Sequence, residues 1–276
     1  MRRLSIFFCM FLLICQAINS HVTVWDLGGV LIDYQLSSLL KYYPLKQQLK
    51  SCISLIKIFG RHPGTFSVKK IYLQTLETLP YKSTVPYSVY SDDGITTLPD
   101  LLKDAQLGLV SYETAQKAWY HSPKPYFLNT IFEFNFNPDL FISGQVIRTN
   151  TVKLLQQCAT QQDEHACNKN VCIILSNMDA TMVPLIKKKF KTEIMDYVDL
   201  EHSIFSGLVN CAKPDKSIFE LLKQKIDALP DHVKGNIIFF DDQKVNRIAA
   251  HQYIPNIICA HPDDAETILR AQGIIA

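Results

Sequence analysis

Polar residues of types that could do chemistry follow several short apolar runs in the sequence. Asp26 follows Val-Thr-Val-Trp, Ser176 follows Cys-Ile-Ile-Leu, and the pair Asp241-Asp242 follows Ile-Ile-Phe-Phe. Lys213 lies in a loop just before a stretch with helical spacing. Carboxylates suit a hard divalent cation, whereas a hydroxyl and a lysine suit phosphate oxygens. Together these residue types indicate a site for a metal ion and a phosphate group.

The apolar runs themselves predict the strands of a parallel sheet. They are short, and stretches with helical spacing separate them, as expected when helices cover both faces of a sheet. Strands are predicted at residues 21–25, 171–175, around 204, 236–240 and 256–260, with helices at 149–158, 182–190 and 217–228. The predicted fold class is therefore α/β, a Rossmann-like parallel sheet sandwiched by helices. Ligands of such sheets bind beyond the carboxyl ends of the strands, so the polar residues should meet at one edge.

A second region interrupts this alternation after the first strand. Nine of the twelve tyrosines lie between Tyr42 and Tyr126, and the apolar residues there follow helical spacing. Residues 99–106 and 111–118 are predicted helices, the second with Ser111 as its N-cap. The chain has 276 residues and is 47% hydrophobic, enough for one large core and a smaller domain. We predict a core of residues 21–34 and 138–276, with a mainly helical cap at 35–137.

The N-terminus has the three-part pattern of an export signal. Arg2 and Arg3 precede an apolar run at residues 4–14, and Cys15-Gln16-Ala17 has the small-x-small pattern of a cleavage site. A second possible cleavage position follows Ser20. The apolar run is too short to span a bilayer. We predict a signal peptide at residues 1–20 and an exported protein, periplasmic or secreted, with no stable membrane association after cleavage.

Charge and cysteine usage limit the partners and cofactors. Without residues 1–20 the chain loses two arginines and no acid, so its 26 acidic residues are matched by as many basic ones. No basic field attracts nucleic acid, and none is predicted as a partner. Six cysteines remain, and an even count in an exported protein allows disulfides. One pair among Cys158, Cys167 and Cys172 is possible, as are six reduced thiols; no Cys-x-x-Cys pair indicates a zinc ribbon.

Four segments of the sequence resemble the motifs of the haloacid dehalogenase (HAD) superfamily. Trp25-Asp-Leu-Gly-Gly-Val-Leu-Ile-Asp33 resembles the first motif in its Asp-Leu-Gly-Gly variant, and Leu175-Ser-Asn177 the second. Lys213-Pro-Asp-Lys-Ser-Ile-Phe219 is similar to the third motif, and Phe240-Asp-Asp-Gln-Lys-Val-Asn246 to the fourth. The insertion between the first two motifs matches the family's helical cap.

The resemblance implies a Mg²⁺-dependent phosphatase acting on a small phosphorylated substrate. Asp26 would be the nucleophile and form an aspartyl-phosphate that water then hydrolyses. Ser176 and the Asn177 amide would bind phosphate oxygens, and Lys213 would neutralise charge on phosphate and nucleophile. For the metal, the resemblance implies a set of oxygen ligands: Asp26, the main-chain carbonyl of Gly28, and Asp241 or Asp242.

One position departs from the pattern of the family's phosphatases. They usually carry a second aspartate two residues after the nucleophile, which protonates the leaving oxygen, and here that residue is Gly28. General acid help contributes roughly 10²–10⁴ in rate. Either the substrate has a good leaving group, or a cap residue supplies the proton, or the chain binds phosphate without turnover as an interaction protein. A metal-independent 2-haloacid dehalogenase is a further alternative, which the doubled Asp241-Asp242 argues against.

Overall fold

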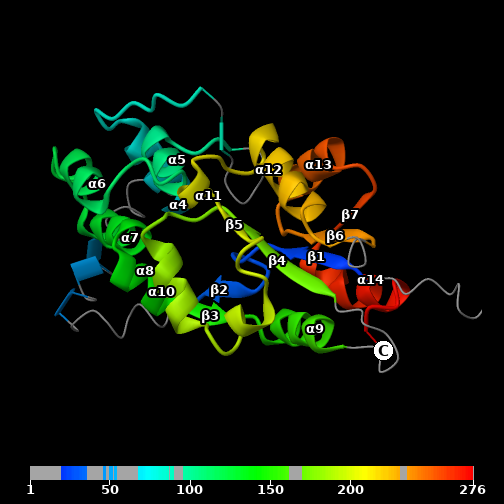
Figure 1. Ribbon diagram of the computed structural model, residues 1–276. Helices are drawn as coiled ribbons and strands as arrows, with labels where there is room; N and C mark the ends of the chain where they lie inside the picture. The colour runs from blue at the N-terminus through cyan, green and yellow to red at the C-terminus, as the bar shows by residue number, and fades with distance from the viewer. Residues whose placement is uncertain are drawn as a thin grey trace, which may run out of the picture.

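The central element of the fold is a five-stranded parallel sheet with the order β5-β4-β1-β6-β7 (Figure 1). The structure is a computed structural model and describes residues 20–35, 46–47, 50–51, 53–54, 68–86, 88–89, 96–161, 170–230 and 235–275. The strands are β1 (Val22–Trp25), β4 (Val171–Ser176), β5 (Ile204–Phe205), β6 (Ile237–Phe240) and β7 (Ile257–Ala260). β1 pairs with β4 and β6, so it lies at the centre. The predicted Rossmann-like sheet is confirmed.

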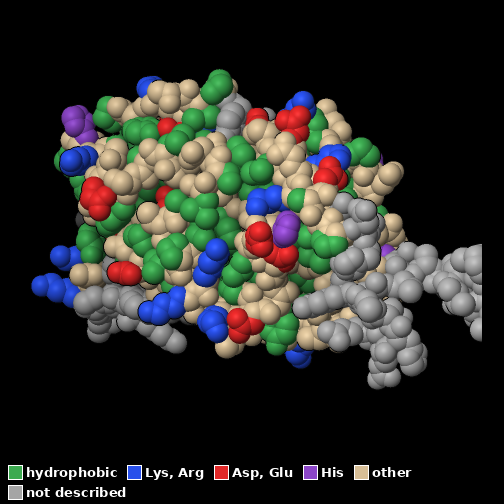
Figure 2. Space-filling view, in the orientation of Figure 1, with side chains coloured by type: hydrophobic (Ala, Val, Ile, Leu, Met, Phe, Trp, Pro, Cys, Tyr) green, Lys and Arg blue, Asp and Glu red, His purple; other side chains and the backbone are tan. Residues whose placement is uncertain are grey.

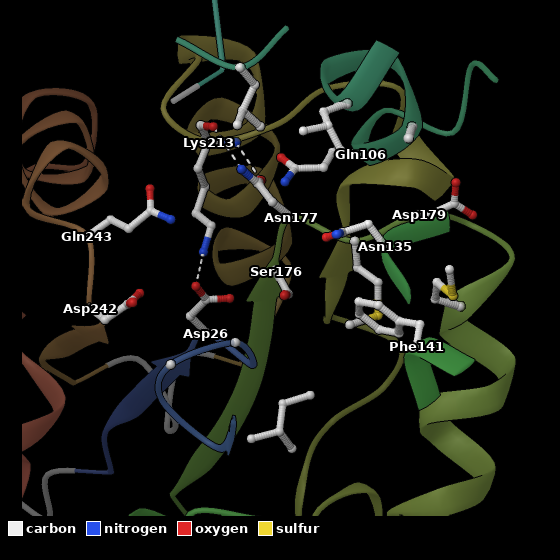
Figure 3. A pocket seen from close by; sticks show the side chains of 18 of the residues that line it. Asp26, Gln106, Asn135, Phe141, Ser176, Asn177, Asp179, Lys213, Asp242 and Gln243 are labelled. Atoms are coloured by element: carbon white, nitrogen blue, oxygen red, sulfur yellow. Dashed lines mark hydrogen bonds and ion pairs between the residues drawn. The ribbon is translucent and has the colours of Figure 1, made fainter. Parts of the chain in front are cut away.

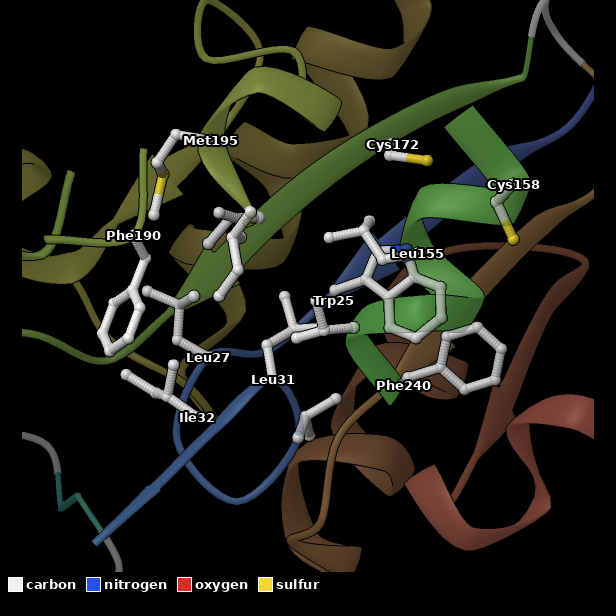
Figure 4. Packing of buried hydrophobic residues seen from close by; sticks show 14 of the residues in the cluster. Trp25, Leu27, Leu31, Ile32, Leu155, Cys158, Cys172, Phe190, Met195 and Phe240 are labelled. Carbon is white, nitrogen blue, oxygen red and sulfur yellow. The ribbon is translucent and has the colours of Figure 1, made fainter. Parts of the chain in front are cut away.

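Alternate side chains of the strands feed two separate apolar clusters, one on each face of the sheet. Trp25 and Phe240 belong to the first cluster, in which their ring centroids lie 4.4 Å apart (Figure 4). Val24 and Phe239 point into the second cluster. Because both faces are buried, nearly every strand residue is apolar rather than every other one, which explains the apolar runs in the sequence.

The helices that cover the sheet are close to the predicted ones. Helix α9 (Thr149–Thr160), α10 (Met182–Lys189) and α12 (Lys216–Asp227) begin and end within two residues of their predicted bounds. Further helices complete the core: α11 (Ser206–Val209), α13 (Lys244–Tyr253), α14 (Ala265–Ala271) and the 3-10 helices Met195–Tyr197 and Pro262–Asp264. Asp215 accepts a hydrogen bond from the Ser217 amide and caps α12, so the loop that carries Lys213 ends at a fixed point.

A small antiparallel pair of strands was not predicted. β2 (Ile32–Tyr34) pairs with β3 (Gln145–Ile147), which brings together two positions where the chain leaves and re-enters the core. The guanidinium of Arg148 donates to the carbonyl of Gly29, and the hydroxyl of Thr151 donates to the carbonyl of Val30. These bonds hold the loop after β1 against the start of α9.

The segment between β2 and β3 has helices and an apolar cluster of its own. Its described helices are α4 (Val68–Glu77), α5 (Asp100–Gln106), α6 (Tyr112–Trp119), α7 (Tyr126–Phe136) and α8 (Pro138–Gly144). We call residues 68–144 the helical segment. Trp119 stacks on Phe132 at 4.7 Å inside the cluster, and Ser111 caps α6 as predicted. The domain boundaries at residues 35 and 137 stay a prediction.

The described residues bear only partly on the export and cysteine predictions. The predicted signal lies outside the described residues except for Ser20, which is buried beside β1. Among the described helices, none has the length and apolar character needed to cross a membrane. Cys158 and Cys172 do not form a disulfide with each other, and Cys167 lies outside the described residues.

On the face shown in Figure 2, acidic and basic side chains both occur over the core and the helical segment.

Candidate active site

Asp26 is held at the end of β1 by the turn that follows it. Its amide donates to the carbonyl of Phe240 at 2.9 Å, and its carboxylate accepts from the amide of Leu27 at 2.7 Å. The amides of Leu31 and Ile32 both return to the carbonyl of Leu27, and all three side chains are fully buried. The turn is thus anchored by apolar side chains, and the carboxylate remains at the carboxyl edge of the sheet.

The two glycines of this turn differ in what they permit. Gly29 has φ of +71°, and a Cβ there would lie 2.4 Å from a carboxylate oxygen of Asp242. A side chain at this position is therefore excluded on two grounds. Gly28 has no left-handed φ, and a Cβ there would meet nothing within 4 Å. The backbone therefore does not require glycine at position 28, because a residue with a side chain would fit there.

Lys213 connects the predicted site residues to one another. Its ammonium lies 2.8 Å from Asp26 Oδ2 (Figure 3). It also lies 2.7 Å from Asp241 Oδ2 and 2.9 Å from the carbonyl oxygen of Leu175. The side chain is 1% exposed. Burial lowers the pKa of Lys213, but the carboxylates of Asp241 and Asp26 outweigh it and raise the pKa above its ordinary value. Lys213 therefore favours its charged form and places a positive charge between the two carboxylates.

The carboxylates outnumber the cation that they surround. Burial raises the pKa of Asp26 to about 7, with Lys213 opposing the shift and Asp241 and Asp242 adding to it. One oxygen from each of the three aspartates lies within 4.8 Å of the others. Oxygen ligands gathered this closely, with one lysine to balance three acids, fit a hard divalent cation. The donor set therefore agrees with the predicted Mg²⁺.

Asp241 and Asp242 take different positions although they are adjacent. Asp241 is fully buried and accepts hydrogen bonds from Lys213, from the amide of Gln243 and from the Asn246 side chain at 3.0 and 3.1 Å. Asp242 lines the cavity and is drawn toward its interior in Figure 3. Asp241 thus fixes Lys213 and Asn246, while Asp242 presents its carboxylate at the cavity wall.

Of the Leu175-Ser-Asn177 segment, Ser176 lines the cavity and the Asn177 side chain supports the loop that carries Lys213. Ser176 ends β4, is buried and lines the cavity. The Asn177 side chain is engaged with the backbone of Lys213: its oxygen accepts from the Lys213 amide at 2.8 Å, and its nitrogen donates to the Lys213 carbonyl at 2.9 Å. The side chain of Asn177 therefore holds the lysine loop in place.

These residues surround a cavity of about 610 Å³ between the core and the helical segment. Of the predicted site residues, the cavity is lined by Asp26, Gly28, Ser176, Asn177, Lys213 and Asp242, and Asp241 lies behind its wall. The opposite wall comes from α4, α5, α7 and α8 and includes Gln106 and Asn135 (Figure 3). Sequence reasoning did not find these two amides, because side chains of the helical segment follow no motif.

Comparison with known proteins extends this description at the level of the fold. The sequence matches no established family profile and no curated protein. A HAD family enzyme from Bacteroides thetaiotaomicron has a similar structure, with 17% identity, a TM-score of 0.51, and coverage of 88% of this chain and 93% of that one. A predicted HAD-like family hydrolase from Porphyromonas gingivalis is similar at 15% identity, with a TM-score of 0.50 and coverage of 93% and 98%. The chain therefore has the Rossmann-like fold of these HAD-family structures.

Proposed function

We propose that this chain is a HAD-type hydrolase, a Mg²⁺-dependent phosphatase that acts on a small phosphate monoester. The observation that carries the proposal is the contact of Lys213 with both Asp26 and Asp241 at the floor of the cavity. Ion pairs this deeply buried cost free energy to desolvate, and perturbed, coupled groups in a cavity are typical of active sites.

The metal would be held on the Asp242 side of the cavity. Asp26, Asp242 and the main-chain carbonyl of Gly28 would be its protein ligands, since all three residues line the cavity. When bound, Mg²⁺ would neutralise negative charge on the phosphate and on the carboxylates. Asp241 would act through Lys213 rather than on the metal, because its two oxygens already accept from Lys213 and Asn246.

The residues of the chain itself supply the nucleophile and the phosphate cradle. Asp26 would attack phosphorus through a carboxylate oxygen, forming an aspartyl-phosphate while the ester oxygen leaves with the electron pair of its bond to phosphorus. Lys213 would favour the ionised form of Asp26 and balance charge on the phosphate, and the Ser176 hydroxyl would donate to a phosphate oxygen. Attack of water on the aspartyl-phosphate then releases phosphate and restores Asp26.

The departing oxygen would receive little proton assistance from this loop. Gly28 stands where an acid would protonate it, and the space around Gly28 is open. We therefore propose substrates whose leaving groups need little protonation, such as aryl, acyl or anomeric phosphates. Activity on primary alkyl phosphates should be far lower, because the barrier then follows the basicity of the leaving oxygen.

Hydrolysis of 4-nitrophenyl phosphate by the wild-type chain and by Asp26→Asn tests the proposal. The wild type should be active with Mg²⁺ and silent in EDTA, and Asp26→Asn should lose activity by about 10³-fold or more while keeping its circular dichroism spectrum. An Asp26→Asn variant that kept most of the activity would exclude the nucleophile. Mg²⁺-dependent phosphate binding without turnover would identify an interaction protein, and chloride release from 2-chloropropionate in EDTA a dehalogenase.

We also propose that residues 1–20 are an export signal that is removed from the mature protein. The basic and apolar pattern of the sequence supports this assignment. Intact-mass measurement of the native protein tests it: cleavage after Ala17 or Ser20 should shorten the chain by 17 or 20 residues. A mass of the full chain would contradict export by this route.

A further inference from the structure

The two walls of the cavity differ in chemistry. The core wall carries the charged groups Asp26, Lys213 and Asp242. The wall facing it is mostly apolar, and its side chains come from α4, α5, α7, α8 and α10: Tyr72, Leu73, Leu102, Ile131, Phe141 and Met182. A phosphate held at the core wall would direct the rest of its ester toward this apolar wall.

The charge along the cavity works against a second anionic group on the substrate. Four described carboxylates line it, from Asp26, Asp33, Asp179 and Asp242. Lys213 is the one lysine, arginine or histidine among the described lining residues, and its ammonium already contacts Asp26. A carboxylate or second phosphate on the ester would be desolvated against apolar side chains with no described cation of its own, which is costly.

Two amide groups at the cavity provide neutral hydrogen-bonding capacity. The Oε1 atom of Gln106 and the Nε2 atom of Gln145 are buried and have no hydrogen-bond partner in the described part of the chain. Both residues line the cavity, and Figure 3 shows the Gln106 amide directed toward Asn177. The Gln106 oxygen accepts and the Gln145 nitrogen donates, so a ligand hydroxyl would satisfy either atom, whereas a ligand carbonyl would satisfy the Gln145 nitrogen.

We propose that the leaving group is a largely apolar phenol or alcohol without an anionic substituent, and that a neutral polar group on it is bound by Gln106 or by Gln145. The proposal rests on the phosphatase function and specifies the substrate class of that site. Phosphate monoesters with a second phosphate or a carboxylate are then poor substrates, and the chain would serve reactions that consume the free phenol or alcohol.

Two aryl phosphates of similar leaving-group reactivity test this selectivity: phenyl phosphate and 3-carboxyphenyl phosphate. Phenyl phosphate should have the higher kcat/KM, exceeding that of the carboxylate by on the order of 100-fold. A 3-hydroxymethyl analogue should match or exceed phenyl phosphate. Equal or better turnover of the carboxylate ester would overturn the proposal.

A pair of lysine substitutions locates the effect in the cavity. Gln106→Lys adds a cation at the apolar wall and should raise kcat/KM for the carboxyphenyl ester relative to phenyl phosphate by about 10-fold or more. Leu109→Lys adds the same charge nearby at an exposed position that does not line the cavity, and should leave the ratio unchanged. Equal changes in both variants would overturn the assignment of Gln106.

Binding separates failure of this inference from failure of the phosphatase function. Isothermal titration of the Asp26→Asn protein with the two unreacted esters reports selectivity without turnover. If neither ester is hydrolysed, the phosphatase function fails, yet tighter binding of phenyl phosphate than of the carboxylate ester still supports a leaving group without an anionic substituent. Binding that is equal for both esters, or tighter for the carboxylate ester, overturns it.

Discussion

The two ends of the central strand β1 each carry a buried ionisable residue, and the comparison separates structure from chemistry. His21 precedes the strand and Asp26 follows it. Burial shifts both toward the neutral form: it lowers the pKa of His21 and raises the pKa of Asp26 to about 7. Burial is the one cause acting on His21, whereas Lys213, Asp241 and Asp242 also act on Asp26.

This difference shows that burial of an ionisable residue does not by itself indicate a functional site. His21 adjoins the amino end of the strand, where its amide donates to Asn170 and its carbonyl accepts from Val171. These are contacts that hold the sheet together. Asp26 lies in a cluster of ionisable groups whose charges depend on each other and which lines a cavity. Coupling to other charges next to open space is what marks the carboxyl end as functional.

The largest effect on stability is expected from removing the central cation. Lys213→Met would leave Asp26 and Asp241 buried against each other without a positive charge, and should lower the free energy of unfolding by about 3–5 kcal/mol in urea titrations. Adding Asp26→Asn should recover part of the loss. The control is Lys103→Met. Lys103 is a buried lysine of α5 whose ammonium lies 3.4 Å from the partly exposed carboxylate of Asp100. An equal loss in both variants would mean that the Lys213 cluster is ordinary packing.

Metal binding should be visible as stabilisation of the carboxyl end. A ligand that binds only the folded chain stabilises it. Mg²⁺ at about 100 times its Kd should therefore raise the free energy of unfolding by about 2.7 kcal/mol, and raise Tm. Asp242→Asn should abolish that increase, and EDTA should reverse it in the wild type. Asp139→Asn, at an exposed acid on α8, is the matched control and should retain it. An undiminished Mg²⁺ shift in Asp242→Asn would remove Asp242 from the metal site.

Substitutions at Gly28 and Gly29 test the carboxyl end of β1 in more detail. Gly28→Asp should fold normally because its Cβ meets nothing within 4 Å, and it should raise kcat/KM on primary alkyl phosphates by roughly 10²-fold by restoring a general acid. Gly28→Ala is the control and should not raise it. Gly29→Ala should instead lower Tm, since φ of +71° and the contact with Asp242 oppose a side chain. An alkyl-to-aryl ratio that is the same in Gly28→Asp and Gly28→Ala would mean that another residue already supplies the proton.

The sequence predicted the charged end of the sheet better than the wall opposite it. Strand positions and the convergence of Asp26, Ser176 and Lys213 follow from apolar runs and from the rule that parallel strands end at one edge. The pairing of β2 with β3 could not be predicted, because three-residue strands carry little periodic signal and Ile32 pairs with the distant Ile147.

The contacts that adjacent site residues make could not be predicted from the sequence either. Nothing local in the sequence separates Asp241 from Asp242, and only the structure shows that the first holds Lys213 while the second lines the cavity. The amides of Gln106 and Gln145 were missed for a related reason. A single polar residue in a helix or short strand has no pattern that tells a cavity from solvent.

The smallest expected effect concerns the amino end of β1 and depends on pH. Because burial lowers the pKa of His21 below the ordinary 6.5, the unfolded chain takes up a proton before the folded chain does as the pH falls. The stability that comes from neutral His21 is therefore complete above about pH 7 and is lost as the pH falls through 6.5 toward the lowered pKa. His21→Gln removes this proton uptake, so its free energy of unfolding should depend less on pH over that window. The same substitution at the exposed His251 is the control for losing a histidine. Urea titrations at several pH values measure the slopes, and a wild-type slope in His21→Gln would show that the histidine is protonated alike in both states, leaving the carboxyl end of β1 as the only end with a perturbed group.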